Sequence, residues 1–201
     1  MMRLAIPFAA LALTLATASA LALTPGQVVG NFTLTDDSGK THELYQSANS
    51  KAIVVMVQGN GCPIVRQAIP ALREVRDEYR SKGVEFLLLN SNLQDSSESI
   101  AKESKEFGFD LPILVDSKQQ VGEALGVQRT SEVFVIDPKT WKLVYRGPID
   151  DRLSYERQRP PSKLYLKDAL DAVVAGQPVK VAQADGVGCI VNFPERNKKR
   201  S

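Results

Sequence analysis

Apolar positions along the chain alternate between continuous runs and helical spacing. Residues 51–57 are apolar from Ala52 onward, and residues 84–89 are apolar except for Glu85, which is typical of strands buried on both faces. Between these runs, from Pro63 to position 79, apolar side chains recur every three or four residues with Arg and Glu in between. This spacing predicts an amphipathic helix that connects two core strands.

The rest of the chain continues this order of strands and helices. The other predicted elements are a short strand over 27–34 with a turn at 36–39, a helix over 96–107 capped by Ser or Asp, a strand over 112–115, a short helix over 120–125 ended by Gly126, strands over 133–136 and 143–145 around a turn, and a helix over 163–175. Alternating strands and helices, followed by two adjacent strands, predict an α/β fold with a central mixed β-sheet flanked by helices.

The N-terminus has the composition of a secretory signal peptide. Arg3 supplies a positive charge, residues 4–16 are apolar, and small residues precede a cleavage position after Ala20 or Ala22. We therefore expect a signal peptide over 1–22 and an exported protein, periplasmic or extracellular. No stable membrane insertion is expected once the signal is removed, because the apolar stretch is short for a membrane span.

The mature chain is expected to form one domain over 23–180 and a tail over 181–201 that carries Cys189. The whole chain has 25 basic and 23 acidic side chains, and cleavage after Ala20 removes one basic residue. Net charge is then close to zero. This balance gives no electrostatic basis for binding nucleic acid or an anionic membrane surface.

Cys62 is the residue whose predicted position most directly favours a reactive side chain. It lies between the predicted strand at 51–57 and the predicted helix that begins at Pro63, so its sulfur is expected at a helix N-terminus. The helix dipole and unpaired backbone N–H groups stabilise a thiolate there, and they can lower a cysteine pKa from about 8.5 to about 3.5–7.5. Cys62 is therefore the predicted nucleophile. Asn60 is expected either to form a hydrogen bond beside the sulfur or to act only as a turn-forming residue.

This arrangement of a cysteine after the first core strand resembles the thioredoxin fold. Thioredoxins carry Cys-x-x-Cys at this helix start and a proline five residues after the second cysteine. Cys62 and Pro70 match this pattern, whereas Val65 occupies the position of the second cysteine. The closer resemblance is to the peroxiredoxin-like redoxins of the AhpC/TSA group, which keep only the first cysteine. The matching segments are 60–63, 90–92, 95–96, 107–112, 116–120, 134–137, 143–147, 149–151, 168–176 and 188–189.

The resemblance implies a thiol oxidoreductase in which Cys62 attacks a peroxide, and Cys189 or an external thiol resets it. It also implies that Arg129 lies near the position at which peroxiredoxins have an arginine that favours the thiolate. We predict that the substrate is contacted by Asn60, Gly61, Pro63, Thr130 and Ser131. The enzymatic alternative is thiol–disulfide exchange with protein clients, and the non-enzymatic one is a thioredoxin-like module that binds cuprous ion or a protein partner.

Two local motifs depart from the peroxiredoxin pattern. Peroxiredoxins carry Pro-x-x-x-Thr-x-x-Cys around the reactive cysteine, and the corresponding positions here are Val55 and Gly59. The fold also usually has a Thr-Pro step with a cis peptide opposite the cysteine, whereas this chain has Thr130-Ser131. A cis bond before serine costs about 2.5–4 kcal/mol, so we expect a trans peptide and an altered loop facing the substrate.

The relation between Cys62 and Cys189 stays open in the sequence. Cys189 follows a glycine-rich stretch that could fold back over Cys62 as a resolving thiol, but only the tertiary fold decides whether the two meet. In an exported protein the same pair could form a permanent structural disulfide. The two interpretations differ in reduction potential, because a resolving pair must be easily reduced.

Two arginine-bearing features also have a functional and a structural interpretation. Arg66, one turn beyond Cys62, could assist the thiolate or could belong to a solvated helix face. The arginine-rich segment 152–161 ends in two prolines and is too irregular for a core element. It either borders the active site and selects a client, or forms a solvent-exposed insertion.

No cofactor or resident metal is expected. A closed zinc site usually requires four Cys, His or carboxylate ligands, and the sequence has no such cluster. His42 is the single histidine, lies far upstream of Cys62, and is predicted to be structural. Cuprous ion accepts few soft ligands, so Cys62, Cys189 and Met56 remain candidate ligands in the binding alternative.

Overall fold

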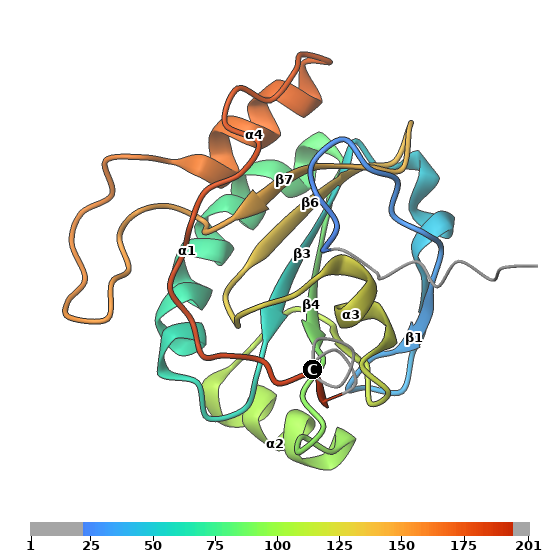
Figure 1. Ribbon diagram of the computed structural model, residues 1–201, viewed down its shortest axis with the longest axis vertical. Coiled ribbons are helices and arrows are strands. Elements are labelled where there is room, and N and C mark those ends of the chain that lie inside the picture. Colours follow the sequence, from blue (N-terminus) through green and yellow to red (C-terminus); the bar gives the residue numbers. More distant parts are fainter. Residues whose placement is uncertain (1–21, 195–201) are drawn as a thin grey trace, which may run out of the picture.

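The computed structural model describes residues 22–194, so the predicted signal peptide before Ala22 and the end of the tail lie outside the described residues. The elements follow one another as shown in Figure 1. They are β1 (Thr33–Thr35), β2 (Thr41–Glu43), the 3-10 helix η1 (Leu44–Asn49), β3 (Ala52–Gln58), α1 (Pro63–Tyr79), the 3-10 turn η2 (Arg80–Lys82), β4 (Val84–Asn90), α2 (Ser97–Phe107), β5 (Ile113–Val115), α3 (Gln120–Leu125), β6 (Val133–Asp137), β7 (Lys142–Gly147) and α4 (Tyr165–Val174).

A five-stranded mixed sheet in the order β5-β4-β3-β6-β7 forms the centre of the domain. Strand β3 pairs in parallel with β4, which pairs in parallel with β5, whereas β6 runs antiparallel to both β3 and β7. Strands β1 and β2 form a separate antiparallel hairpin. The predicted α/β fold with a mixed sheet flanked by helices is confirmed.

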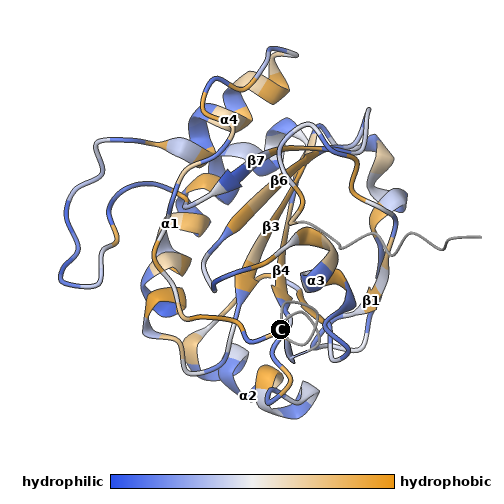
Figure 2. Cartoon of the chain, in the orientation of Figure 1, coloured by the Kyte–Doolittle hydropathy of each residue, from blue (hydrophilic) through white to orange (hydrophobic). Residues whose placement is uncertain are grey.

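Alternate residues of the sheet pack into two cores. On β3, Val54 belongs to one core together with Leu72 of α1 and Leu170 of α4, and all three are fully buried. Its neighbour Val55 belongs to the other core, where it packs with Leu125 of α3. Figure 1 shows α1 and α4 on one side of the sheet and α3 on the other, and Figure 2 shows the apolar strands between them. Because both faces are covered, β3 and β4 are almost entirely apolar in the sequence, apart from Glu85 and the polar residue that ends each strand.

Local signals fix the helix ends. The Ser96 side chain accepts a hydrogen bond from the Ser99 N–H at 3.2 Å and so caps α2, which ends at Gly108 in the left-handed conformation. Helix α3 likewise ends at Gly126, as predicted, with φ of 71°. Over residues 22–194, no helix combines the length and apolar character that a bilayer crossing requires.

The first 50 residues depart most from the predicted elements. The expected strand over 27–34 was wrong in extent, because only its end belongs to β1. The preceding residues run beside β7 instead, where the Val29 N–H donates to the Trp141 carbonyl at 2.7 Å. Strand β2 and the 3-10 helix η1 were missed, since they are short and have too few buried positions to produce a clear period.

Candidate active site

Cys62 ends the turn that joins β3 to α1. It is the N-cap residue of α1, Pro63 is the first helical residue, and the Cys62 N–H donates to the Gly59 carbonyl at 3.3 Å. Gly61 makes this turn with φ of 73° and, like Pro63, is exposed. Cys62 itself is only 3% exposed. The sequence therefore placed the sulfur correctly at a helix N-terminus, but the sulfur is covered.

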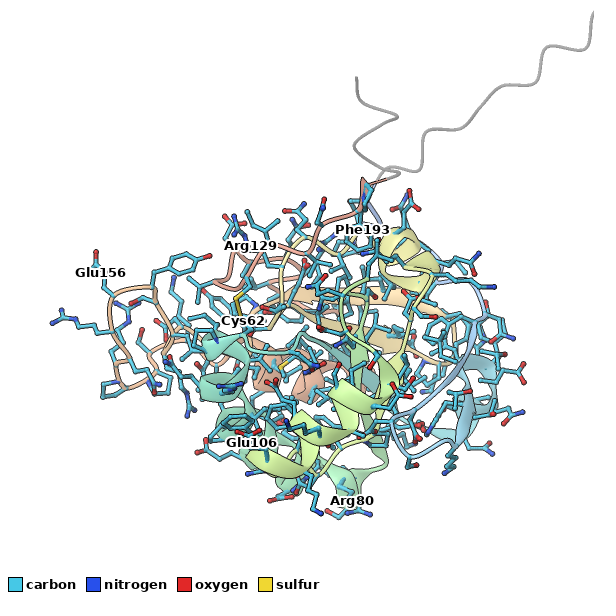
Figure 3. The ribbon with its side chains drawn as sticks, turned by 90° about the horizontal axis from the view of Figure 1, so that it is seen from below. Cys62, Arg80, Glu106, Arg129, Glu156 and Phe193 are labelled. Carbon is cyan, nitrogen blue, oxygen red and sulfur yellow. A yellow bond between two sulfur atoms is a disulfide. The ribbon has the colours of Figure 1, made fainter. Side chains whose placement is uncertain are left out.

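The structure pairs Cys62 with Cys189 in a disulfide that joins residues 127 positions apart. Their Cα atoms are 6.3 Å apart, and Figure 3 shows the yellow sulfur–sulfur bond beside the Cys62 label. Of the two residues, Cys189 is exposed. Tertiary structure thus brings the predicted nucleophile and the predicted resolving thiol into one site.

Non-covalent contacts hold the tail on both sides of Cys189. Before it, the backbone of Ala182 and Ala184 pairs with Arg146 at the end of β7, with hydrogen bonds of 3.0 and 3.2 Å. After it, the Val191 N–H donates to the Gln128 carbonyl at 3.0 Å, and the Val191 side chain is buried. Because these contacts do not involve sulfur, we expect the tail to keep Cys189 near Cys62 when the disulfide is reduced.

Thr130 connects both cysteines. Its backbone N–H donates to the Cys189 carbonyl at 2.9 Å, and its hydroxyl oxygen accepts from the Cys189 N–H at 2.9 Å. The same hydroxyl lies 3.1 Å from the Cys62 sulfur. Since the hydroxyl oxygen already accepts one bond, its own hydrogen can point to the sulfur, where it would stabilise a thiolate. Thr130 was predicted to contact substrate, and in this structure it contacts the tail.

The residue before Cys189 must be a glycine for the tail to lie where it does. Gly188 is buried, and a Cβ built on it would collide with the carbonyl oxygen of Thr130. A side chain at this position would push Cys189 away from both Thr130 and Cys62. The sequence suggested that the glycine-rich stretch is flexible. The structure adds that a glycine at position 188 is required for the tail to approach the Thr130 carbonyl closely.

Tyr155 ties the insertion between β7 and α4 to the disulfide. Its hydroxyl donates to the Gly188 carbonyl at 3.0 Å and accepts from the Gly188 N–H at 3.2 Å. The Arg129 guanidinium donates to the same hydroxyl at 3.2 Å. Although most of the insertion projects away from the domain, as the position of Glu156 in Figure 3 shows, one side chain of it borders the active site. Sequence reasoning missed Tyr155, whose pairing with the tail has no local signal.

Arg129 makes its hydrogen bonds to the insertion and the tail rather than to the Cys62 sulfur. Besides Tyr155, its guanidinium donates to the Gly188 carbonyl at 3.5 Å. Arg66 is likewise engaged, since it pairs with Glu103 at 3.1 Å and its guanidinium stacks 3.6 Å from the centre of the Phe107 ring. In the described part of the chain, both candidate cations therefore contact groups other than the sulfur, and the assistance of Arg129 to a thiolate stays a prediction.

A partly buried polar network supports the turn before Cys62. The Asp95 carboxylate accepts from the Asn60 N–H at 3.0 Å, and the Asn60 amide donates to the Ser99 hydroxyl at 3.0 Å. The Glu103 carboxylate accepts from the Gly61 N–H at 2.8 Å. Asn60 thus acts on the turn rather than on the sulfur in this state. Glu103 was missed, although a charged residue on the same helical face as buried Ile100 was a usable signal.

Comparison with known proteins identifies the family. The AhpC/TSA family profile matches residues 25–145, which is more than half of the chain. This chain belongs to the AhpC/TSA family. The thiol-disulfide oxidoreductase ResA of Geobacillus thermodenitrificans is 28% identical over 116 residues, which cover 58% of this chain and 65% of ResA, so the match spans less than two thirds of that relative.

Solved structures extend the likeness to most of the domain. A hypothetical protein of Sinorhizobium meliloti matches with a TM-score of 0.76 and 29% identity, over 86% of this chain and 96% of that one. A putative thiol:disulfide interchange protein DsbE of Chlorobium tepidum matches with a TM-score of 0.63 and 20% identity, over 76% of this chain and 99% of that one, which is a likeness of fold.

The two departures of this AhpC/TSA member from the peroxiredoxin pattern have steric reasons. A Cβ on Gly59 would lie 2.6 Å from the Asn92 amide nitrogen and 2.9 Å from the Thr130 methyl group, so the threonine of the pattern would require these side chains to shift. Ser131 has φ of 63°, which the ring of proline forbids. Its N–H donates to the Val57 carbonyl at 2.7 Å, and the peptide before it is trans, as expected.

His42 and Met56, the other residues considered for metal chemistry, lie apart from the disulfide. His42 is on β2, with its Nε2 atom 2.7 Å from the Asp36 carboxylate, which agrees with the predicted structural role. Met56 is fully buried in β3. Within residues 22–194, no group of three or more His, Cys, Asp or Glu side chains is placed to hold a metal ion.

Proposed function

We propose that this protein is an exported thiol–disulfide oxidoreductase that exchanges disulfides with protein clients through Cys62 and Cys189. The observation that carries the proposal is the meeting of two distant cysteines at the N-terminus of α1, with the Thr130 hydroxyl 3.1 Å from the Cys62 sulfur. The ResA and DsbE proteins are named for this chemistry. Export is supported by the signal-like composition of the N-terminus.

The proposed cycle needs only the two thiols and an external thiol reductant. In the dithiol form, the Cys62 thiolate attacks a client disulfide, forms a mixed disulfide and releases one client thiolate, which takes a proton. The Cys189 thiolate then attacks the Cys62 sulfur, which forms the observed bond and releases the second client thiol. The client gains two electrons and the protein loses two, and the reductant restores the dithiol form.

The site favours this cycle because both sulfurs have defined environments. Cys62 lies at the positive end of α1, where a thiolate is stabilised. Cys189 lies in a tail that is held by Arg146 on one side and Gln128 on the other, which keeps its effective concentration high. Cys189, although distant in the sequence, can therefore replace the second cysteine of the thioredoxin motif, whose position is occupied by Val65.

A redox titration tests the proposal. The purified protein is equilibrated in glutathione and dithiothreitol buffers of graded potential, and the thiols are counted by alkylation and mass spectrometry. We expect a midpoint between about −120 and −270 mV, the range of thioredoxin-type catalysts. A midpoint below about −300 mV would identify a permanent structural disulfide and overturn the proposal.

Peroxide reduction is the second candidate, and the Thr130 hydroxyl near the Cys62 sulfur is the observation in its favour. Against it, Arg129 and Arg66 contact other groups, and Gly59 occupies the position of the threonine in the peroxiredoxin pattern. The test treats reduced Cys189→Ser protein with limiting hydrogen peroxide. We expect little oxidation of Cys62 over minutes, and rapid conversion to sulfenic acid would make peroxide reduction the main function.

A further inference from the structure

We propose that a cavity between α1, the insertion after β7 and the tail binds a short peptide that carries both a free ammonium and a free carboxylate. Binding there involves no sulfur chemistry, so this site goes beyond the proposed exchange function, and either can be wrong while the other is right. Three features of the cavity point to such a ligand: its apolar walls, a buried hydroxyl group without a partner, and two unpaired charges of opposite sign.

Three segments that are distant in the sequence enclose the cavity. In Figure 1 the tail, drawn in red, runs past α1 on the side of the insertion. Ala68 and Ala71 line the cavity from α1, Ile149 and Leu153 from the insertion, and Val187 from the tail. Its volume is about 370 Å³, near the lower end of the range for small-molecule sites. The cavity therefore has room for a small ligand with a partly apolar body.

Ser131 lines this cavity and has a buried hydroxyl group. The residue is 5% exposed, and its hydroxyl forms no hydrogen bond with any group of residues 22–194. Buried polar groups in native proteins are nearly always hydrogen-bonded, because an unpaired one is destabilising. Ser131 also has φ of 63°, a conformation that costs energy in residues other than glycine and that clusters at ligand-binding positions. A polar group of a ligand would satisfy this hydroxyl.

The cavity wall carries three acidic and three basic side chains, and four of the six neutralise one another. The Asp150 carboxylate lies 2.7 Å from the Arg152 guanidinium, and the Asp151 carboxylate lies 3.3 Å from the Arg159 guanidinium. Charges that are paired within the wall attract a charged ligand only weakly. One basic and one acidic side chain of the wall remain to select the ligand.

Lys163 and Asp185 are these two remaining charges. Neither forms an ion pair, with the other or with any further residue in the described part of the chain, and the Lys163 ammonium lies 5.9 Å from the centre of the Tyr165 ring. A ligand carboxylate at Lys163 and a ligand ammonium at Asp185 would complete both. Because Lys163 and Asp185 do not reach each other, the two charges of the ligand should be separated as well. The ends of a short peptide fit this better than a single amino acid, whose charges lie on one carbon.

Three related dipeptides test the ligand class. Glycyl-leucine carries both charges, glycyl-leucinamide lacks the carboxylate, and N-acetylglycyl-leucine lacks the ammonium. Each is titrated into the oxidised full-length protein, and binding is followed by the NMR shifts of the Ser131 and Val187 amides. We expect glycyl-leucine to bind about fivefold more tightly than either derivative, because each derivative lacks one ion pair. Equal affinities, or no shift at millimolar peptide, would overturn this proposal and leave the redox titration of the exchange function unaffected.

Charge variants test which residue faces which end of the peptide. Lys163→Gln should bind glycyl-leucine and glycyl-leucinamide equally, because the carboxylate has lost its partner. Asp185→Asn should likewise bind glycyl-leucine and its N-acetyl form equally. Lys118→Gln is the matched control, since Lys118 is exposed between β5 and α3 and does not line the cavity. A preference for the free carboxylate that survives Lys163→Gln would overturn the assignment.

Ser131→Ala separates ligand binding from structural stability. The free energy of unfolding should stay unchanged or rise, because the variant removes a buried polar group that has no partner, whereas the affinity for glycyl-leucine should fall about tenfold. Urea denaturation and the NMR titration measure the two effects. Ser117→Ala, at an exposed position, should change neither. Wild-type affinity in Ser131→Ala would show that the peptide does not bind at this hydroxyl and would overturn the proposal.

Discussion

The N-terminal hairpin and the C-terminal tail both lie outside the central sheet, but they are held in different ways. In the hairpin, the Asp36 carboxylate accepts from the N–H groups of Ser38 and Lys40 at 2.9 Å and contacts His42, all within six residues. The tail is held by the backbone of Arg146 and Gln128 and by the bond between Cys189 and Cys62, all distant in the sequence.

This difference means that the two regions respond to different conditions. A hairpin held partly by a carboxylate depends on pH, because protonation weakens the hydrogen bonds that the charged form accepts. A tail held partly by a disulfide depends on redox potential. Sensitivity to pH and sensitivity to redox potential are therefore separated between the two ends of the described chain, and each can be perturbed without the other.

Removing the disulfide should have the largest effect. Cys62→Ser or Cys189→Ser should lower the free energy of unfolding by about 3–5 kcal/mol, because the bond closes a long loop. Client turnover should fall to background. Urea denaturation measures the loss of unfolding free energy. In hydrogen exchange, the Val191 amide should lose protection while the Lys40 amide of the hairpin keeps it. Equal loss at both amides would contradict the separation.

Gly188→Ala should affect the tail nearly as strongly. The new methyl group collides with the Thr130 carbonyl, so the free energy of unfolding of the oxidised protein should fall by about 3 kcal/mol. Gly30→Ala is the matched control, since a Cβ there meets no atom within 4 Å. Urea denaturation compares the two variants, and a stable Gly188→Ala protein would show that the tail can be repositioned.

Acid should act on the hairpin. Burial raises the pKa of Asp36, but hydrogen bonds from Ser38, His42 and the Lys40 backbone outweigh it and lower the pKa to about 2. The folded pKa lies below the ordinary 3.8, so the stabilisation is complete above about pH 4 and is lost as pH falls through about 2. The contribution is about 2 kcal/mol.

Urea denaturation of Asp36→Asn across pH 2–6 measures this contribution. The difference in unfolding free energy from wild type should be largest above pH 4 and shrink toward pH 2. Asp185→Asn, an exposed position on the tail, serves as the control. A difference that stays constant across this range would show that Asp36 stabilises the hairpin through shape and not through charge.

Thr130→Val should give the smallest change in stability. It removes the hydroxyl that contacts both cysteines, at a cost of about 1 kcal/mol. Since a Cys62 thiolate also loses a hydrogen-bond donor, reduction of the disulfide by glutathione should slow about tenfold. Thr33→Val, on an exposed strand position, is the control. An unchanged reduction rate would remove Thr130 from the proposed mechanism.

Local patterns predicted much of the fold and half of the site. The apolar runs of β3 and β4 and the spacing of α1 were sufficient to place Cys62 at a helix start, because each signal lies within one element. The hairpin strands were poorly predicted because they are short and partly exposed. Glu103 and Tyr155 were missed because their partners, Gly61 and Gly188, lie on other elements.

The sequence by itself determined the order of the elements and the helix N-terminus at Cys62, since hydrophobic periodicity and turn residues act over a few positions. Only the tertiary structure decided that Cys189 reaches Cys62, that Thr130 lies between them, and that the predicted nucleophile is the covered sulfur. Contacts across 127 positions depend on how packed elements meet in space, and the residues along the chain carry no local signal for them.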